Sequence, residues 1–422
     1  MKLSKFGSKL SAQTGIVSLM DDLGEAMSSG RSFRMLGGGN PARIPEVEAR
    51  FRQAMRGILD NGDQFERMIG CYDGPQGSAE FIEALAALFQ SEFGWSTGPE
   101  NIFITNGSQS AFFALFNMFA GLRSDGVRSK ILLPITPEYI GYSDTGVEDP
   151  IFDSHRPTID TLDDGLFKYR VNFDDITVDD SIGAICVSRP TNPTGNVLTD
   201  EELQTLAGLA AGNDIPLIVD DAYGAPFPNI IFSSATPVWD ENIILCLSLS
   251  KLGLPGVRTG IVVARPEIVR NLSSMAAIMS LAPNSFGPGL ALDLVKSREI
   301  ISISNEIIRP YYQRRGQEAS QWIRDAMADY PFYVHKPEGA IFLWLWFPDL
   351  PITSRQLYER LKERGVLVIA GEYFFPGMGT DWRHRYECIR VTYSQDPEDV
   401  EAGLRIIAEE VIRVYDKQRQ TA

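Results

Sequence analysis

The feature that most constrains the fold is an alternation of short apolar runs with amphipathic stretches. Five such runs lie at 101–105, 130–135, 184–188, 216–220 and 243–249. Continuous apolar runs of this length predict strands that are buried on both faces of a sheet. The stretches 108–122 and 200–212 are helical candidates, and Thr199 and Glu202 form a possible capping box before the second. The pattern predicts an α/β fold, with a mainly parallel sheet wrapped by helices.

The pattern changes after about residue 300. A polar helical candidate is followed by the apolar run 340–347, a helix at 354–364, the run VLVIA and a closing helix after Asp396. This order is typical of a smaller α+β domain. Because 422 residues exceed what one core usually supports, we expect two domains. We place the large domain at 62–300, and build the small domain from 1–61 and 301–422.

The charge balance limits the possible partners. The chain has 39 Lys and Arg against 55 Asp and Glu, a net charge of -16, which disfavours nucleic acids and anionic membranes. The start, MKLSKFGSKL, lacks the apolar run of a signal peptide, and no run is apolar for the ~18 residues of a membrane span. We therefore expect a soluble, cytoplasmic protein.

The cysteines and histidines do not form a recognisable metal site. The cysteines show no CxxC spacing, so we expect them to be free and mostly buried, with no metal bound. The histidines fall outside the motifs described below and receive no role. These seven residues are Cys71, Cys186, Cys246, Cys388, His155, His335 and His384.

Polar clusters follow the predicted strands, at the edge of the sheet where α/β proteins bind ligands. The first cluster, TNGSQSAF, begins at Thr105 and places a glycine turn before a helix. The free N–H groups of that helix start would suit a phosphate, with Ser108 and Gln109 as further donors. An ordinary capped turn is the alternative.

Three more clusters supply single candidates. Tyr139 in PEYIGY could lie against an aromatic ring, although, taken alone, a tyrosine at such a place more often serves only for packing. Asn192, in the stiff turn RPTNPTG, offers a neutral amide. Asp220 ends an apolar strand, where a carboxylate needs a cationic partner unless it merely caps a helix.

The fifth cluster contains Lys251, two residues beyond the apolar run 243–249. Desolvation would lower the pKa of an ammonium there, and its neutral amine form would then attack carbonyl groups. Many lysines at strand ends, however, simply extend to water. Together the clusters provide an anion cradle, a carboxylate, an amide, a stacking ring and an imine-forming lysine. Pyridoxal 5′-phosphate requires this set of groups.

These motifs resemble the class I/II aminotransferase family of fold-type I pyridoxal-phosphate enzymes. The resemblance rests on an S-x-S-K signature with a downstream R-x-G, an N-P-T-G turn and a D-x-x-Y pair. It extends over nearly the whole chain through MLGGGNP, YDGPQG, TNGSQSAFF, PEYIGY, SRPTNPTGN, SLSKLGLPG and KPEGAIFLWLWF. Within the family these stretches are most similar to enzymes that act on valine and pyruvate.

The resemblance implies a role for each matching residue. Lys251 would form the internal aldimine with the cofactor, Asp220 would pair with the pyridine nitrogen, and Tyr139 would stack on the ring. Tyr223 and Asn192 would bond to the 3′-oxygen. The phosphate would be held by Ser108, Gln109, Ser248, Ser250 and Arg258.

The resemblance also covers residues outside the large sheet. Arg390, in IRVTYS, would bind the substrate carboxylate. The alternative is a surface arginine on a strand. Gly39 lies in the segment that would close over the substrate, although its GGGNP stretch also fits a simple turn. Tyr72 would reach the phosphate of a neighbouring subunit, which implies a homodimer with shared sites. Arg258 follows Lys251 by seven residues, one fewer than is usual in the family.

The implied reaction is ping-pong transamination between an amino acid and a 2-oxo acid. No Arg or Lys lies between Asn271 and Val295, where dicarboxylate-specific members carry a second arginine. We therefore expect a small apolar substrate, valine or alanine, with pyruvate or 3-methyl-2-oxobutanoate as the oxo acid. A β-lyase or synthase reaction with the same cofactor stays open. A regulator on this fold would need a basic DNA-binding segment before GGGNP, which begins by residue 37.

Overall fold

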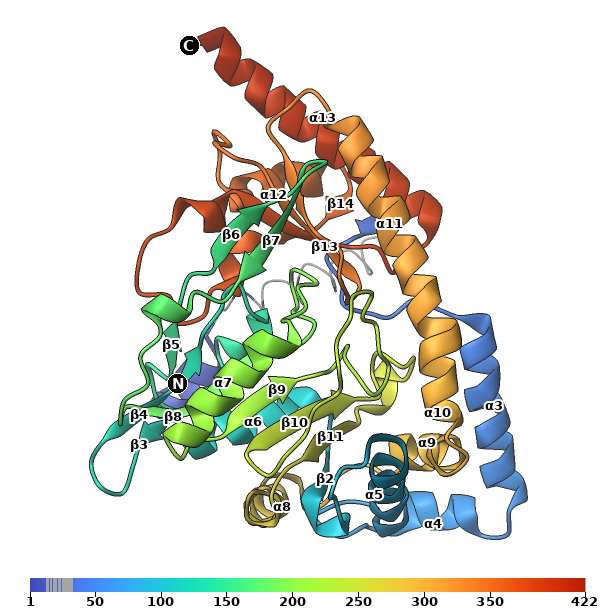
Figure 1. Cartoon of the computed structure of the whole chain (residues 1–422). Helices are drawn as coiled ribbons and strands as arrows, with labels where there is room; N and C mark the ends of the chain where they lie inside the picture. Colours follow the sequence, from blue (N-terminus) through green and yellow to red (C-terminus); the bar gives the residue numbers. More distant parts are fainter. Residues whose placement is uncertain (13–14, 16, 18–20, 22–23, 25–32, 422) are drawn as a thin grey trace.

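The computed structural model describes residues 1–12, 15, 17, 21, 24 and 33–421. Its largest sheet has eight strands (Figure 1). Their order is β2 (Ile102–Thr105), β11 (Gly260–Val263), β10 (Ile243–Ser248), β9 (Leu217–Asp220), β8 (Ile182–Ser188), β4 (Arg128–Leu133) and β3 (Gly121–Leu122), with β5 (Phe152–Ser154) also on β4. Pairing is parallel from β10 through β9, β8 and β4 to β5, and antiparallel at β11 and β3. The predicted mainly parallel α/β sheet is confirmed.

Helices cover both faces of this sheet. They are α5 (Ala79–Phe93), α6 (Ser108–Phe119), α7 (Asp200–Gly212), α8 (Pro266–Ser280) and α9 (Phe286–Lys296). On β8, Ile185 belongs to the apolar cluster that contains Leu206 of α7. The next side chain, Cys186, belongs to a second cluster with Phe116 of α6. Because neighbouring side chains of a strand point to opposite faces, α7 and α6 lie on opposite sides of the sheet.

The start of α7 is formed as its sequence predicts. The backbone N–H of Glu202 donates to Thr199 Oγ1 at 3.1 Å, and the N–H of Thr199 donates to Glu202 Oε2 at 2.8 Å. This capping box satisfies two N–H groups at the start of the helix. The five predicted strands are all present, whereas β11 was not predicted because its apolar run is only four residues long.

A second sheet of six strands lies beside the C-terminal part of the chain. Its order is β15 (Ile369–Ala370), β16 (Cys388–Thr392), β13 (Phe342–Trp346), β12 (Tyr333–His335), β7 (Leu166–Arg170) and β6 (Thr158–Thr161). The hairpin β6–β7 therefore pairs with C-terminal strands, although it lies inside the range 62–300. The boundary between the two domains, placed at 62–300 from the sequence, remains a prediction.

Helices and a short strand pair complete the molecule. Figure 1 shows α11 and α13 crossing on one side of the second sheet, and α3 running down beside α10 and α9. Strands β1 and β14 pair in parallel and join the N-terminal segment to the C-terminal part. The remaining elements are β1 (Arg34–Met35), α1 (Lys5–Leu10), α3 (Pro45–Asp60), α4 (Gln64–Gly70), α10 (Glu299–Ser302), α11 (Arg309–Ala326), α12 (Ser354–Glu363), β14 (Val366–Leu367) and α13 (Pro397–Thr421).

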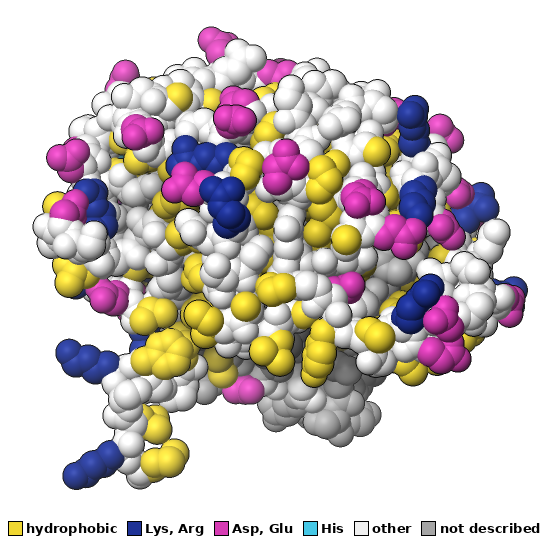
Figure 2. Space-filling view, turned by 90° about the horizontal axis from the view of Figure 1, so that it is seen from below, with side chains coloured by type: hydrophobic (Ala, Val, Ile, Leu, Met, Phe, Trp, Pro, Cys, Tyr) yellow, Lys and Arg dark blue, Asp and Glu magenta, His cyan; other side chains and the backbone are white. Residues whose placement is uncertain are grey.

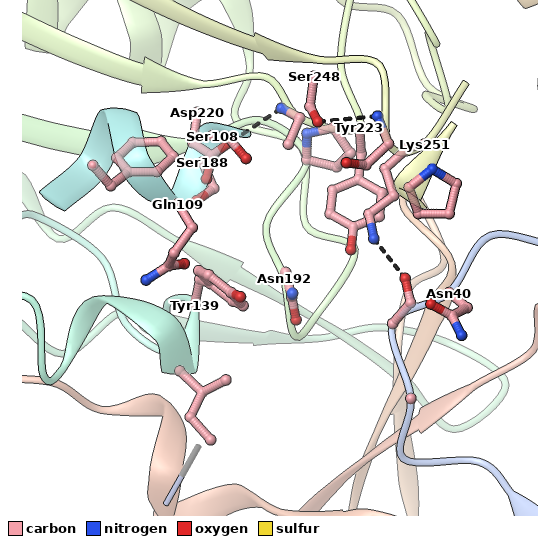
Figure 3. Close-up of a pocket in the computed structure, with 18 of the residues that line it drawn as sticks. Asn40, Ser108, Gln109, Tyr139, Ser188, Asn192, Asp220, Tyr223, Ser248 and Lys251 are labelled. Carbon is pink, nitrogen blue, oxygen red and sulfur yellow. Dashed lines mark hydrogen bonds between the residues drawn. The ribbon is translucent and has the colours of Figure 1, made fainter. Parts of the chain in front are cut away.

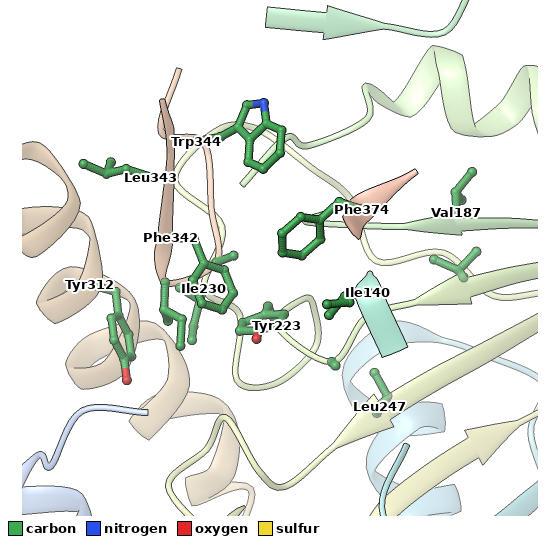
Figure 4. Packing of buried hydrophobic residues seen from close by; sticks show 14 of the residues in the cluster. Ile140, Val187, Tyr223, Ile230, Leu247, Tyr312, Phe342, Leu343, Trp344 and Phe374 are labelled. Atoms are coloured by element: carbon green, nitrogen blue, oxygen red, sulfur yellow. The ribbon is translucent and has the colours of Figure 1, made fainter. Parts of the chain in front are cut away.

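One apolar core joins the two sheets (Figure 4). Tyr223, just after β9, meets Phe342 of β13 with ring centroids 5.8 Å apart. Trp344 of the same strand meets Phe374 edge-on at 5.6 Å. This packing holds the carboxyl ends of the large sheet against β13 and β16. Any site at those strand ends is thus enclosed by both parts of the chain.

Candidate active site

A cavity of about 250 Å³ lies at the carboxyl ends of β8, β9 and β10 (Figure 3). Strand ends, the start of α6, β16 and the N-terminal segment around Gly39 all contribute to it. Twelve of the thirteen residues predicted from the sequence line it: Gly39, Ser108, Gln109, Tyr139, Asn192, Asp220, Tyr223, Ser248, Ser250, Lys251, Arg258 and Arg390. The exception is Tyr72.

Asp220 is the last residue of β9 and lines the cavity. Its side chain is 8 % exposed. Tyr142 donates its hydroxyl hydrogen to Oδ2 at 2.6 Å, and the backbone N–H of Ala222 donates to Oδ1 at 3.0 Å. Burial raises the pKa of Asp220 to about 6, against the lowering effect of these two bonds. Neither donor carries a charge, so the carboxylate is ready to accept a cation.

Lys251 follows β10 and lies opposite the N-terminal segment. Its Nζ donates to the carbonyl oxygen of Gly39 at 2.5 Å and lies 5.0 Å from the ring centre of Tyr223. The pKa of Lys251 is lowered to about 7, mainly by burial and also by the positive charges of Arg390 and Arg258, against the opposing effect of Asp220. The amine is therefore partly neutral at physiological pH, which a nucleophile toward carbonyl groups requires.

The turn between β2 and α6 forms the anion cradle. Gly107 has φ +88°, and a Cβ there would lie 2.3 Å from Nη2 of Arg258. A Cβ on Gly260, the glycine of the R-x-G signature, would lie 2.7 Å from the backbone N of Ser108. Both glycines are needed because the helix start and the arginine approach each other so closely. The lysine loop, although one residue short, still brings Arg258 to the cavity.

The other candidates of the cradle are held by local hydrogen bonds. Gln109 donates from Nε2 to the carbonyl of Gly141 at 2.8 Å, while its Oε1 is buried without a hydrogen-bond partner. Ser248 Oγ accepts from the backbone N–H of Ser250 at 3.1 Å. Nη1 of Arg258 donates weakly to Ser250 Oγ at 3.5 Å. Donors thus surround one end of the cavity, as a phosphate group would require.

Arg390 enters the cavity from β16 and is only 2 % exposed. Its Nη1 donates to Asn192 Oδ1 at 2.7 Å, and its Nη2 donates to the carbonyl of Gly37 at 2.7 Å. The guanidinium lies over the ring of Phe342 at 4.0 Å. Burial lowers the pKa of Arg390 to about 10, so it stays charged at neutral pH. A buried, charged fork of this kind is suited to a carboxylate.

Three buried residues behind Asp220 were missed in the sequence. Glu138 and Tyr142 are both 0 % exposed, and Ser188, at the end of β8, is 3 % exposed. Their hydrogen bonds reach Asp220 through Tyr142. Glu138 and Tyr142 belong to the same PEYIGY motif as Tyr139. A carboxylate within a largely apolar motif was the signal that could have singled out Glu138.

Tyr72 lies apart from the cavity of its own chain. Its side chain is 84 % exposed, and the neighbouring Asp73 accepts a hydrogen bond from Ser285 Oγ at 2.8 Å. The three histidines are likewise outside the cavity lining. All four cysteines are free, and Cys71 alone among them is exposed. Within the described residues, no group of three or more His, Cys, Asp or Glu side chains could hold a metal ion, and no helix could cross a membrane.

Comparison with known proteins identifies the family. The family model described as aminotransferase class I and II matches residues 147–407. A valine–pyruvate aminotransferase of Escherichia coli strain K12 is 49% identical over 415 residues, which cover 98% of this chain and 99% of that protein. The chain belongs to the class I and II aminotransferase family. It is therefore an enzyme of amino-group transfer.

Solved structures of aminotransferases support the same assignment. A valine–pyruvate aminotransferase from Salmonella typhimurium LT2 superposes with a TM-score of 0.88 at 48% identity, covering 95% of this chain and 100% of that one. An aspartate aminotransferase from Thermus thermophilus has a TM-score of 0.79 at 22% identity, covering 97% of this chain and 100% of that one. The second likeness shows the fold alone, which is that of fold-type I aminotransferases.

Proposed function

We propose that this aminotransferase binds pyridoxal 5′-phosphate at Lys251 and exchanges amino groups between a small apolar amino acid and a 2-oxo acid. The observation that carries the proposal is the joint presence of Lys251, Asp220 and Arg390 in one enclosed cavity. It costs free energy of folding to bury these three groups together: an amine with a lowered pKa, a carboxylate without a cationic donor and a guanidinium. A phosphorylated pyridine aldehyde and an amino acid would satisfy all three groups.

The cavity fits the cofactor at both of its ends. Asp220 would accept the proton-bearing pyridine nitrogen, since its present donors are uncharged. The cradle of Ser108, Ser250 and Arg258 would hold the phosphate, and Gly107 leaves the room that the Arg258 guanidinium occupies there. The wider set comprises Gln109, Tyr139, Asn192, Tyr223 and Ser248, for the roles that the family resemblance implies. When bound, the cofactor supplies an electron sink for negative charge at the substrate Cα.

The residues of the chain would divide the remaining tasks. Nζ of Lys251 would hold and move the proton between the substrate Cα and the cofactor, because its pKa of about 7 allows both protonation states. Arg390 would bind the substrate carboxylate in place of its bonds to Asn192 and Gly37. Gly39 and its neighbours would cover the bound substrate and exclude water.

The charges of the cavity favour an apolar substrate side chain. Among the described lining residues, the charged ones are Asp220, Lys251, Arg258 and Arg390. Each of them has a role toward the cofactor or the α-carboxylate, so none is left for a second carboxylate. The names of the relatives from E. coli and S. typhimurium agree with valine and pyruvate as substrates. A pocket of this kind separates methylene homologues only ~10 to 200-fold, so alanine and 3-methyl-2-oxobutanoate should also react.

We further propose a homodimer in which Tyr72 reaches the partner's phosphate site. Exposed apolar side chains lie on α4, at the end of α8 and at the start of α9: Ile69, Ile278, Met279, Leu281 and Phe286. The bond from Ser285 to Asp73 brings these segments together beside Tyr72. Figure 2 shows apolar side chains gathered on the face seen from below, where Figure 1 places α4 and α8. This face adjoins the cavity, because Asn284 donates from its backbone N–H to Asn106 Oδ1 at 2.9 Å, next to the cradle. Large exposed apolar patches mark protein interfaces.

A Lys251→Ala variant tests the function directly. Turnover of valine and pyruvate should be abolished, because no other residue at the site combines a lowered amine pKa with access to the cofactor. Substantial turnover by the folded variant would remove Lys251 from its role. Product analysis of the wild type separates the alternative lyase chemistry, since a lyase releases ammonia without an oxo-acid acceptor.

Sedimentation of the holoenzyme tests the dimer. A Tyr72→Ala variant should stay dimeric but lose cofactor affinity. A monomeric wild type at micromolar concentration would contradict the shared site. A cytoplasmic location and the domain division at 62–300 remain predictions of the sequence.

A further inference from the structure

A chain of buried oxygen atoms leads from Glu138 to Asp220. The backbone N–H of Ser188 donates to Glu138 Oε1 at 2.9 Å, and Ser188 Oγ lies 2.6 Å from Oε2. Ser188 Oγ is also 3.4 Å from the hydroxyl of Tyr142, which donates to Asp220 at 2.6 Å. The chain thus has three side-chain contacts in sequence and ends at the carboxylate that would meet the cofactor.

The environment of Glu138 disfavours a negative charge. The residue is 0 % exposed, and the groups that bond to its two oxygens are uncharged: the N–H and hydroxyl of Ser188 and the backbone N–H of Tyr139. The pKa of Glu138 is raised to about 8, mainly by burial and also by the nearby charge of Asp220, against the lowering effect of its hydrogen bonds. The backbone N–H of Glu138 is fixed from the other side by the carbonyl of Phe374 at 2.8 Å. An environment of this kind favours the neutral form of a carboxyl group.

The proton on Glu138 decides the direction of the hydrogen bonds. If Glu138 is ionised, the Ser188 hydroxyl donates to it, Tyr142 donates to Asp220, and the contact between the two hydroxyls contains no hydrogen. If Glu138 is protonated, it donates to Ser188, Ser188 donates to Tyr142, and Tyr142 donates to Asp220. With Asp220 ionised, only the second arrangement places a hydrogen in all three contacts, and all of them then point toward Asp220.

We propose that Glu138 is a neutral carboxylic acid that acts as a positioning residue, and that through Ser188 and Tyr142 it keeps Asp220 ionised toward the cofactor's pyridine nitrogen. This inference rests on the proposed function, because it assigns the far end of the chain to the cofactor. Other titratable groups near the two carboxyls are Tyr139, Cys186, Asp221, Tyr223, Cys246 and Lys251. Lys251 is the cation among them, and it favours an ionised Asp220.

The test is the pH profile of cofactor binding. Tyr142→Phe removes the hydroxyl that donates to Asp220 and leaves only the backbone N–H of Ala222, so the pH below which the affinity for pyridoxal phosphate falls should rise by about one unit. Glu138→Leu should move the profile in the same direction, because Ser188 then loses its donor. Glu138→Gln should keep the wild-type profile, since an amide N–H can donate to Ser188 as the carboxylic acid does. Tyr415→Phe is the matched control, because it removes a buried hydroxyl that bonds to Pro348 at 2.7 Å, far from the cavity.

Two results would overturn the proposal. The profile of Tyr142→Phe could match the wild type, or Glu138→Gln could shift it as much as Glu138→Leu, which would mean that Glu138 acts as an anion. Difference infrared spectroscopy of wild type against Glu138→Gln gives a readout independent of the cofactor. The wild type should show the carbonyl stretch of a protonated carboxylic acid, and this band should be absent from the variant. If the band lost in the variant is instead that of a carboxylate, Glu138 is not neutral. If the wild type binds no cofactor, the proposed function fails, while the infrared result still decides the protonation of Glu138.

Discussion

Replacement of Arg390 by lysine separates the geometry of the guanidinium from its charge. In the structure Arg390 presents Nη1 and Nη2 as two donors, each engaged at 2.7 Å by the oxygen of Asn192 or Gly37. A substrate carboxylate would take both donors at once. Lysine keeps the positive charge but offers a compact ammonium on a shorter, flexible stem, so one of the two bonds is lost.

The expected loss follows from the value of one hydrogen bond to a charged group. Such a bond contributes ~1.5–3 kcal/mol, which corresponds to a ~10 to 150-fold fall in kcat/KM. Both half-reactions bind an α-carboxylate through the same arginine. The fall should therefore be similar for valine and for pyruvate.

Single-turnover kinetics, monitored by the visible absorption of the cofactor, measures each half-reaction separately. Arg315→Lys is the matched control, because Arg315 is 3 % exposed and bonds to Glu318 and Gln395 away from the cavity. Its half-reactions should be unchanged. An Arg390→Lys enzyme within about threefold of the wild type, or a defect in only one half-reaction, would refute the assigned role of Arg390.

Three further predictions concern pH and the cradle. Capture of pyridoxal phosphate by the apoprotein should accelerate as the pH rises through about 7, because the pKa of Lys251 is lowered to about 7 and only the neutral amine attacks; a flat rate in stopped-flow absorbance would contradict this. Gly107→Ala should weaken cofactor binding, since its Cβ would lie 2.3 Å from Nη2 of Arg258; an unchanged dissociation constant would count against the cradle. Burial lowers the pKa of His335 and His384 to about 3, so the unfolded chain binds more protons below the ordinary value of 6.5. The two histidines should therefore contribute less to the free energy of unfolding as the pH falls from 6.5 toward 3, while the raised pKa values of Glu138 and Asp220 act in the opposite direction. A pH dependence of the urea midpoint that is the same in the wild type and in a His384→Gln variant would contradict this contribution.

Much of the large sheet could be predicted from the sequence, because its strands are apolar on both faces. Asp220 and Lys251 stand directly after such strands, so their meeting at one edge followed from the topology of a parallel sheet. The capping box at Thr199 was local and equally predictable. The hairpin at 158–170 was not, because its first strand is mostly exposed and its second strand pairs with a strand far along the chain.

The parts of the site that the sequence did not reveal depend on contacts between distant residues. Gly37 meets Arg390 across 353 positions of sequence, and Ser188 meets Glu138 across 50. No local pattern encodes such pairs. The role proposed for Glu138 became visible only when its neighbours proved to be uncharged.

The central claim is that Lys251 holds a cofactor that accepts and returns an amino group. The most direct measurement is the visible absorption spectrum of the purified holoenzyme, recorded before and after L-valine and then after pyruvate. The cofactor band should fade with valine and return with pyruvate. A band that ignores valine but responds to another amino acid would contradict the substrate, and the absence of any band after addition of pyridoxal phosphate would contradict the claim itself.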